Sequence, residues 1–349
     1  MSINPREIPT GAVRYNTDSN KMEVYIGDTW MEVAVSSPNL GDSSSPAGTR
    51  GLFFGEFDDS SNTPTIDYVT ISSTGNAVDY GDLINSVQFY GGVCSSHRRW
   101  VYFGGAPGNP TNQMQFGEIA HLGNGTDFGN LTESTHYNPS GVGNRTRGVR
   151  MGGSVDPSGG AQNTMDYWAY ESLGNAVDFG DLVAAKRFAM SANSPTRGMI
   201  AGGGFTNPTI GDNIIQFITI ASTGNAQTFG DISSDNKAFG GNGACSNATR
   251  ALFGGGGPSY QTTVSTVQMA TLGDSFDFGD LTLARNYSGS TASATRAVWG
   301  GGYHTSPSAT YVNTIDYMNI ATGGTAADFG DRTVAGSYAS GCSNGHGGL

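Results

Sequence analysis

A unit of about 50 residues recurs along most of this chain of 349 residues, and this recurrence restricts the fold more than any other feature. The clearest marker of each unit is an aromatic residue followed by Gly and Asp, or in one unit by Gly and Asn. The aromatic residues of the marker stand 48, 51, 50, 49 and 51 positions apart. The markers are Tyr80–Gly81–Asp82, Phe128–Gly129–Asn130, Phe179–Gly180–Asp181, Phe229–Gly230–Asp231, Phe278–Gly279–Asp280 and Phe329–Gly330–Asp331.

A second marker is an arginine that precedes a short apolar run ending in glycines, and it occurs once in each unit. Its arginines are Arg50, Arg99, Arg147, Arg197, Arg250 and Arg296. Each unit divides into four short segments rich in Val, Ile, Thr, Tyr and Phe, separated by clusters of Gly, Asn, Asp and Ser. Four short strands in a repeat of this length predict an all-β fold, a six-bladed β-propeller over residues 49–349.

The register of the repeats predicts how such a ring closes. The chain ends with a first-strand segment at residues 336–345, and no second strand follows it. The first unit begins with a second strand at residues 50–55, and no first strand precedes it. The C-terminal strand is therefore expected to complete the first blade, which removes the open sheet edges.

Residues 1–48 lie outside the repeats. Alternating segments between Gly11 and Val33 predict a small β-meander in residues 1–35, and a Ser, Pro and Gly-rich linker follows at residues 36–48. About three short strands are marginally stable alone. We therefore expect this module to associate with a partner protein or with copies of itself, and the chain to be a homo-oligomer.

Composition argues against several classes of protein. The net charge of −12 disfavours nucleic acid as a partner. No apolar run reaches the length of a membrane helix, and the N-terminus lacks the pattern of a secretory signal. The three cysteines, Cys94, Cys245 and Cys342, show no CxxC spacing and are interpreted as small buried residues.

The sequence also predicts no enzymatic activity, no cofactor and no metal site. The repeated arginines and acidic residues could bind an anionic sugar, yet they recur in every unit, whereas an active site is normally single. We interpret them as structural residues that tie strands or turns together through charge-assisted hydrogen bonds. The acidic residues of this structural set are Asp82, Asp181, Asp231, Asp280 and Asp331. The glycine-rich segments lack a phosphate-loop motif, and the five histidines show no metal-ligand spacing.

The connection between the second and third strands varies most between repeats, whereas the turn between the third and fourth strands stays short. In an antiparallel blade these variable loops emerge on the same face as the connections to the next blade. Loops on a rigid scaffold are where recognition usually occurs, although neutral drift of loop sequence explains the variation equally well. The candidate ligand-binding residues on this face are Phe57, Phe205, Tyr260, Tyr303, His304 and Tyr311.

The order of arginine, apolar run, paired glycines, variable loop and alternating aromatic strand resembles kelch-type propeller repeats over about 300 residues. An aromatic–Gly–Asp unit stands where kelch blades often carry a Trp. The block TIDYVTI, STGNA and DFGDL more closely resembles repeats in virion structural proteins of tailed phages, especially phages of marine cyanobacteria. The leader GAVRYNTDSNKMEVYIGDTWMEV resembles short modules of phage tail fibres and other virion proteins.

This resemblance implies a virion protein that is assembled in the host cytoplasm. The expected role is a tail fibre or receptor-binding component. Its N-terminal module would bind other virion proteins, and its propeller would bind a host surface glycan or protein. One alternative is a decoration or cement protein of the capsid, whose loops contact only virion proteins. A second alternative is a carbohydrate-active propeller enzyme, which needs a carboxylate pair or an activated nucleophile at one place on the ring.

Overall fold

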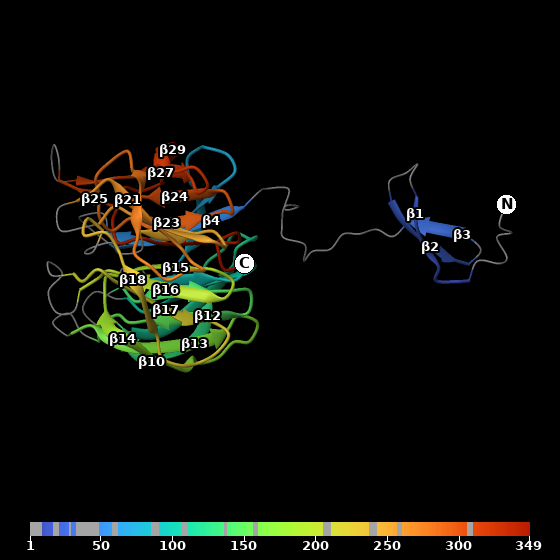
Figure 1. Cartoon of the computed structure of the whole chain (residues 1–349), viewed down its shortest axis with the longest axis horizontal. Helices are drawn as coiled ribbons and strands as arrows, with labels where there is room; N and C mark the ends of the chain where they lie inside the picture. Colours follow the sequence, from blue (N-terminus) through green and yellow to red (C-terminus); the bar gives the residue numbers. More distant parts are fainter. Residues whose placement is uncertain are drawn as a thin grey trace. The chain divides into compact units, whose positions relative to one another are not determined.

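The computed structural model describes residues 9–16, 21–27, 29–32, 49–57, 62–84, 91–105, 111–135, 138–155, 160–204, 211–236, 243–256, 260–305 and 310–349. Every regular element in these ranges is a β-strand, which confirms the predicted all-β class. The chain divides into two units, Met1–Ser44 and Ser45–Leu349 (Figure 1). The predicted linker at residues 36–48 lies outside the described residues. Within the ranges above, there is no helix with the length and hydropathy needed to span a membrane.

The first unit contains one antiparallel sheet of three strands, in the order in which they occur along the chain. Its strands are β1 (Val13–Asn16), β2 (Lys21–Ile26) and β3 (Thr29–Glu32). Val24 of the central strand pairs with Val13 on one side and with Met31 on the other. Paired residues point to the same face of the sheet, so Val13, Val24 and Met31 share one face and their neighbours along each strand point to the other.

The second unit repeats a sheet of four antiparallel strands, and each sheet begins with a short first strand at one edge. The sheets are β30 (Ser340–Ser343), β4 (Arg50–Phe57), β5 (Asn62–Thr70) and β6 (Val78–Asp82); β7 (Gly92–Ser95), β8 (Arg99–Phe103), β9 (Thr111–Glu118) and β10 (Thr126–Thr135); β11 (Ser140–Gly143), β12 (Arg147–Met151), β13 (Gln162–Ala169) and β14 (Val177–Lys186); β15 (Met190–Asn193), β16 (Arg197–Ala201), β17 (Ile214–Thr219) and β18 (Gln227–Asp231); β19 (Ala244–Ser246), β20 (Arg250–Gly254), β21 (Thr263–Gln268) and β22 (Phe276–Asp280); and β23 (Gly289–Ala292), β24 (Arg296–Gly300), β27 (Thr314–Asn319) and β29 (Ala327–Asp331).

Three short strands add to this pattern. The two-residue strand β28 (Gly324–Thr325) pairs in parallel with β22 of the preceding sheet. Strands β25 (Tyr303–His304) and β26 (Thr310–Tyr311) pair with each other between β24 and β27. They therefore occupy the variable connection between the second and third strands of the last sheet.

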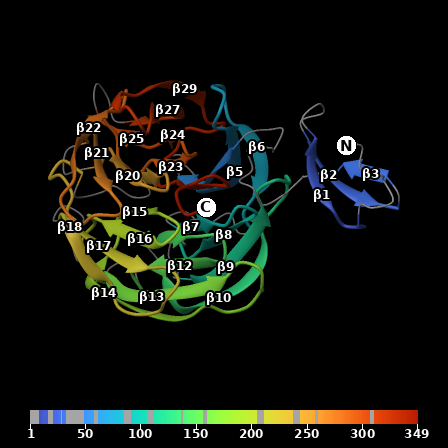
Figure 2. The same ribbon diagram turned by 45° about the vertical axis from the view of Figure 1, so that its right-hand side comes forward.

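The C-terminal strand belongs to the first sheet, as the register of the repeats predicts. Ser340 pairs with Phe54, and Ser343 pairs with Gly51, although these partners lie almost 300 residues apart in sequence. The first strand of each sheet lies against the first strand of the next, in the order β30, β7, β11, β15, β19, β23 and back to β30. Figure 2 shows these sheets arranged around a centre where the C-terminus lies.

The apolar core lies between adjacent sheets. Phe54 of the first sheet packs edge-on against Trp100 of the next sheet, with 5.0 Å between ring centroids. Phe103 of that second sheet packs in the same way against Trp168 of the third, at 5.2 Å. Trp100 and Phe103 are fully buried. The two faces of each sheet therefore serve two different cores, so the sheets stabilise one another in sequence.

Candidate functional site

The six repeated arginines tie each sheet to the next. In every case a guanidinium Nη1 donates a hydrogen bond to the carbonyl of the residue that follows the third strand of the next sheet. The pairs are Arg50 with Ile119 (2.8 Å), Arg99 with Tyr170 (2.8 Å), Arg147 with Ile220 (3.0 Å), Arg197 with Met269 (2.7 Å), Arg250 with Ile320 (2.7 Å) and Arg296 with Ile71 (3.0 Å). The last pair runs from the sixth sheet back to the first.

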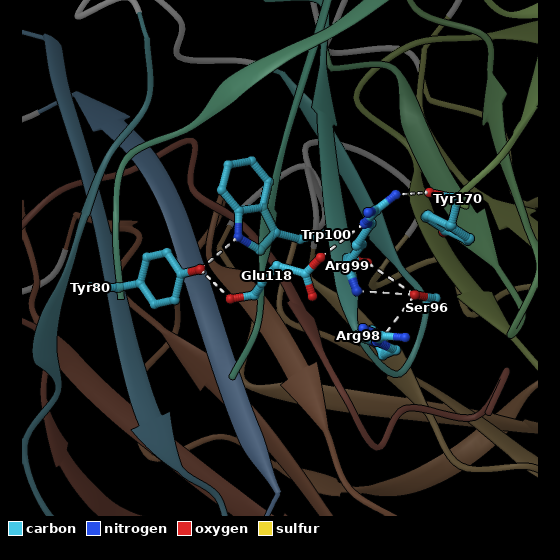
Figure 3. A network of polar contacts seen from close by, with 7 residues as sticks. All are labelled: Tyr80, Ser96, Arg98, Arg99, Trp100, Glu118 and Tyr170. Carbon is cyan, nitrogen blue, oxygen red and sulfur yellow. Dashed lines mark hydrogen bonds and ion pairs between the residues drawn. The ribbon is translucent and has the colours of Figure 1, made fainter. Parts of the chain in front are cut away.

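Figure 3 shows one of these ties with its surroundings. The Arg99 guanidinium donates to the carbonyl of Tyr170 at 2.8 Å and forms an ion pair with Glu118 at 3.0 Å. The Ser96 hydroxyl accepts the backbone N–H of Arg99 at 3.0 Å, which holds the turn before β8. On the other side of Glu118, its carbonyl accepts the hydroxyl of Tyr80 at 2.6 Å. The network therefore joins three consecutive sheets.

Each repeated arginine also stacks on an aromatic ring of its own sheet, which holds the guanidinium in place for its carbonyl. The Cζ-to-centroid distance is 4.4 Å for Arg147 over Tyr167 and 4.8 Å for Arg197 over Phe217. In the fifth sheet the ring comes from the fourth strand, since Arg250 lies over Phe278 at 4.7 Å. These contacts explain why an aromatic residue accompanies the arginine in every repeat.

The aromatic–Gly–Asp marker contacts the next sheet through its backbone rather than through the carboxylate. The carbonyl of Asp82 accepts the N–H of Gly125 from the next sheet at 2.7 Å, and Asp181 accepts from Ala226 in the same way at 2.8 Å. The corresponding bonds are made by Asn130, Asp231, Asp280 and Asp331 with Ala176, Ser275, Ala326 and Ala77. We expected charge-assisted bonds between the two markers. The arginines do donate hydrogen bonds, but their acceptors are backbone carbonyls and not the carboxylates of the marker.

The glycine of the marker is required by this close approach. Gly81 has a φ of +145°, and a Cβ built there would lie 2.5 Å from the carbonyl oxygen of Gly123. Gly129, Gly180, Gly279 and Gly330 have φ values between +135° and +146° and face the equivalent turn of the next sheet. L-residues with side chains rarely adopt this conformation. The marker thus identifies the seam between sheets.

Sequence reasoning missed a set of fully buried ion pairs whose aspartates lie on the third strands. Asp166 pairs with Arg150 at 2.8 Å, and both side chains are completely buried. Asp316 with Arg285 and Asp67 with Arg332 are also buried ion pairs, but in these two the arginine follows the fourth strand of the preceding sheet. Each of these aspartates also accepts a threonine hydroxyl, from Thr132, Thr282 and Thr333 respectively. The available signal was a carboxylate in the middle of an apolar strand, as in the motif TIDY.

The C-terminal tail lies across the ends of the first strands. The Nε2 of His346 donates to the carbonyl of Ser95 at 2.7 Å, and its Nδ1 accepts N–H bonds from Asn193 and Gly348, each at 3.0 Å. A Cβ added to Gly347 would lie 2.3 Å from the carbonyl oxygen of Asn247. Burial lowers the pKa of His346 to about 4. A proton on Nδ1 would also point at two donors, so the neutral ring fits this position.

Beneath the tail is a small cavity of about 40 Å³, lined by the first strands and His346. Such a volume has room for water but not for a larger ligand. The three cysteines line this cavity and are free and buried. Burial raises the pKa of Cys94 and Cys245 to about 12, so their thiols remain protonated and poorly nucleophilic.

The structure brings four of the six candidate ligand-binding residues together. Phe57 at the end of β4 packs against Tyr311 with 5.8 Å between ring centroids. Tyr311 lies 4.9 Å from Tyr303, which lies 5.9 Å from Tyr260. All four are half-buried. His304 is buried, with 7% of its surface exposed, and Phe205 lies outside the described residues.

Three further aromatic residues, which the sequence analysis did not select, extend this group. Tyr287 and Tyr338 lie 4.3 Å apart, and Phe188 lies 6.1 Å from Tyr287. Burial, together with the neighbouring Tyr303 and Tyr338, raises the pKa of Tyr260. We call these residues the aromatic cluster: Phe57, Phe188, Tyr260, Tyr287, Tyr303, Tyr311 and Tyr338.

Backbone strain accompanies the cluster. Tyr260, Phe188, Tyr287 and Tyr338 have φ values of +49°, +55°, +57° and +63°. A bulky side chain in this left-handed region is a genuine outlier and costs on the order of 1 kcal/mol or more. Phe188, Tyr287 and Tyr338 each stand just before a first strand, where Asn138 occupies the same place in the third sheet at a φ of +31°. Strain of this kind is concentrated at ligand sites.

In chemical terms the cluster offers aromatic faces that can stack on an apolar surface, together with phenol hydroxyls that can donate and accept hydrogen bonds. Over the ranges that the structure describes, no group of three or more His, Cys, Asp or Glu side chains is placed to hold a metal ion. Comparison with models of known protein families gave no match, and neither did a search of curated proteins.

Proposed function

We propose that this chain is a non-enzymatic virion structural protein that presents a closed, six-bladed β-propeller to a ligand on the host surface. Support for the ring comes from the arginine ties, which lead from each sheet to the next and from Arg296 back to Ile71. The contacts between first strands follow the same cyclic order. Each four-stranded sheet is then one blade, and β30 closes the ring.

The observation that carries the proposal is that the aromatic cluster and the chain ends of the second unit lie at opposite ends of the strands. Thr49 lies against Gly345, and the Arg50 N–H donates to the Asn344 side chain at 2.9 Å. Phe57 stands at the other end of the same strand, β4. Seven residue steps along a strand correspond to roughly 23 Å. The segment from the N-terminal module therefore joins one face, and the cluster occupies the other.

The chemistry of the cluster favours a saccharide as the ligand. Tyrosine combines a broad apolar face with a polar hydroxyl, and aromatic side chains with a few polar groups are typical of small-molecule sites. The net charge of −12 disfavours an anionic ligand. We therefore propose a neutral glycan of the host surface, with a host protein as the alternative partner of the same face.

Binding to a glycan array, followed by adsorption of particles to host cells, tests this function. We expect the double variant Tyr260→Ala, Tyr303→Ala to lose binding about tenfold or more, while the control Leu122→Ala, at an exposed turn, binds as before. Both assays would be made on particles that contain the normal amount of the protein. Unchanged adsorption by the tyrosine variant would favour the decoration protein, and a cleaved glycan would favour the carbohydrate-active enzyme.

The anchoring role of the first unit has its own test. A chain that lacks residues 1–48 should fold as a propeller but fail to enter particles. Incorporation at the normal level would contradict anchoring by this module, without bearing on the ligand of the aromatic cluster.

A further inference from the structure

One face of the sheet in the first unit is made of apolar side chains that lie in the solvent. The cross-strand pairs Val13 with Val24, Tyr15 with Met22, and Val24 with Met31 place these residues on the same side. Val13, Tyr15, Met22, Ile26 and Met31 are 57%, 55%, 43%, 47% and 52% exposed. We call this surface the apolar face; Val24 and Thr29 complete it. Its members carry no charge.

The opposite face of the sheet carries charged and aromatic side chains that cover one another, and Tyr25 on this face is only 3% exposed. Arg14 forms an ion pair with Glu23 at 2.8 Å, and its guanidinium lies over the ring of Trp30 at 4.2 Å. Trp30 packs against Tyr25, with 5.2 Å between centroids, and Asn16 donates to Glu23 at 2.8 Å. This face is therefore already covered by its own side chains, whereas the apolar face is the one that gains from being covered.

We infer that the apolar face packs against the apolar face of a second copy of this chain. A three-stranded sheet with one uncovered hydrophobic face is marginally stable, and stacking two such sheets face to face removes both apolar faces from water. The occupant must be apolar and broad, because the face offers no charge for recognition. A second copy always supplies such a surface, and the same patch on both sides is what a two-fold interface requires.

The size of the face sets the strength of this association. The exposed parts of its residues amount to on the order of 450 Å², which is within the range of the largest patch on a typical monomer. Complete pairing of two copies then buries at most on the order of 900 Å², which is below the size of a stable interface and in the range of weak, transient ones. We therefore expect a reversible, concentration-dependent dimer. This inference refines the expected homo-oligomer and does not depend on the proposed role in the virion.

The test compares the mass of the full chain by sedimentation velocity from about 1 μM to 100 μM, a range suited to weak association. The first variant is Val13→Lys, Met31→Lys, which places charges on the apolar face. The second is Val13→Thr, Met31→Thr, which makes the face more polar while retaining residues that favour strands. The matched control is Leu122→Lys, Leu173→Lys, because both leucines are 58% exposed in the second unit.

We expect the wild type and the leucine control to dimerise, and both apolar-face variants to raise the dissociation constant about a hundredfold or more. Hydrogen exchange of β2 would report whether the sheet persists in the threonine variant. A wild type that stays monomeric over the whole range would overturn the inference. So would a dimer that both variants retain, since its interface would then lie elsewhere in the chain.

Discussion

His346 connects the C-terminal tail to the ends of the first strands, and replacing it with glutamine tests whether the tail depends on a neutral imidazole. The ring donates to the carbonyl of Ser95 at 2.7 Å and accepts from the Asn193 amide at 3.0 Å. Glutamine is neutral at every pH and keeps a donor and an acceptor. Comparing the wild type with His346→Gln therefore separates the effect of protonating the ring from the effect of losing its hydrogen bonds.

The expected loss of folding stability at low pH follows from the pKa of His346, which burial lowers from 6.5 to about 4. Above pH 6.5 the ring is neutral in both the folded and the unfolded chain, and its contribution to stability is fully present. As the pH falls from 6.5 towards 4, only the unfolded chain takes up the proton, so stability is lost. At 1.36 kcal/mol per pKa unit the loss is about 1 kcal/mol by pH 5.5 and about 3 kcal/mol by pH 4.

Urea unfolding at pH 7.5, 5.5 and 4.0, followed by tryptophan fluorescence, measures this difference. We expect the free energy of unfolding of the wild type to fall by about 3 kcal/mol more than that of His346→Gln between pH 7.5 and pH 4.0. His121→Gln, at an exposed turn, is the control and should follow the wild type. If His346→Gln lost as much stability as the wild type, or if NMR titration of the His346 ring gave a midpoint near 6.5, the reasoning would be wrong.

Three further predictions concern the contacts between and within sheets, and each is measured by urea unfolding. Gly81→Ala should destabilise the fold by about 2–4 kcal/mol, and clearly more than Gly123→Ala, whose added methyl group has the same strain but open space; equal losses would contradict the close approach between sheets. Asp166→Ala should cost about 3–5 kcal/mol because it leaves Arg150 buried and unpaired, whereas the double variant with Arg150→Met should recover part of that loss. Arg197→Met should cost about 2 kcal/mol through the lost carbonyl bond and ring stacking, and a loss below about 0.5 kcal/mol would show that the tie is not stabilising.

Periodicity alone was enough to predict the all-β class, because a repeat of about 50 residues with strand-length apolar runs leaves few alternatives. It also predicted that the C-terminal strand completes the first unit, which lacks a first strand of its own, and Ser340 does pair with Phe54. Alternation between Gly11 and Val33 indicated strands in the first unit. These predictions depend only on local patterns and on the order of the segments.

The partners of the repeated residues were decided by the tertiary structure. The arginines are evident in the sequence, but their acceptors are backbone carbonyls in the next sheet, such as Ile220 for Arg147. A carbonyl leaves no trace in residue identity, so no pattern of side chains could have revealed it. For the same reason, we expected the Asp82 carboxylate to make the contact with the next sheet, although the Asp82 carbonyl makes it.

The aromatic cluster likewise contains residues that the sequence could identify and residues that only the structure revealed. Tyr303 and Tyr311 could be selected because they stand in a loop that varies between repeats. Tyr287 and Tyr338 could not be selected in this way, because they stand just before a first strand and not in a variable loop. Their left-handed backbone conformation is visible only in the structure. Sequence determined which residues are available on the loops and strands. Only the packing of distant segments decided which of them meet, since contacts between sheets depend on positions in space and not on separation along the chain.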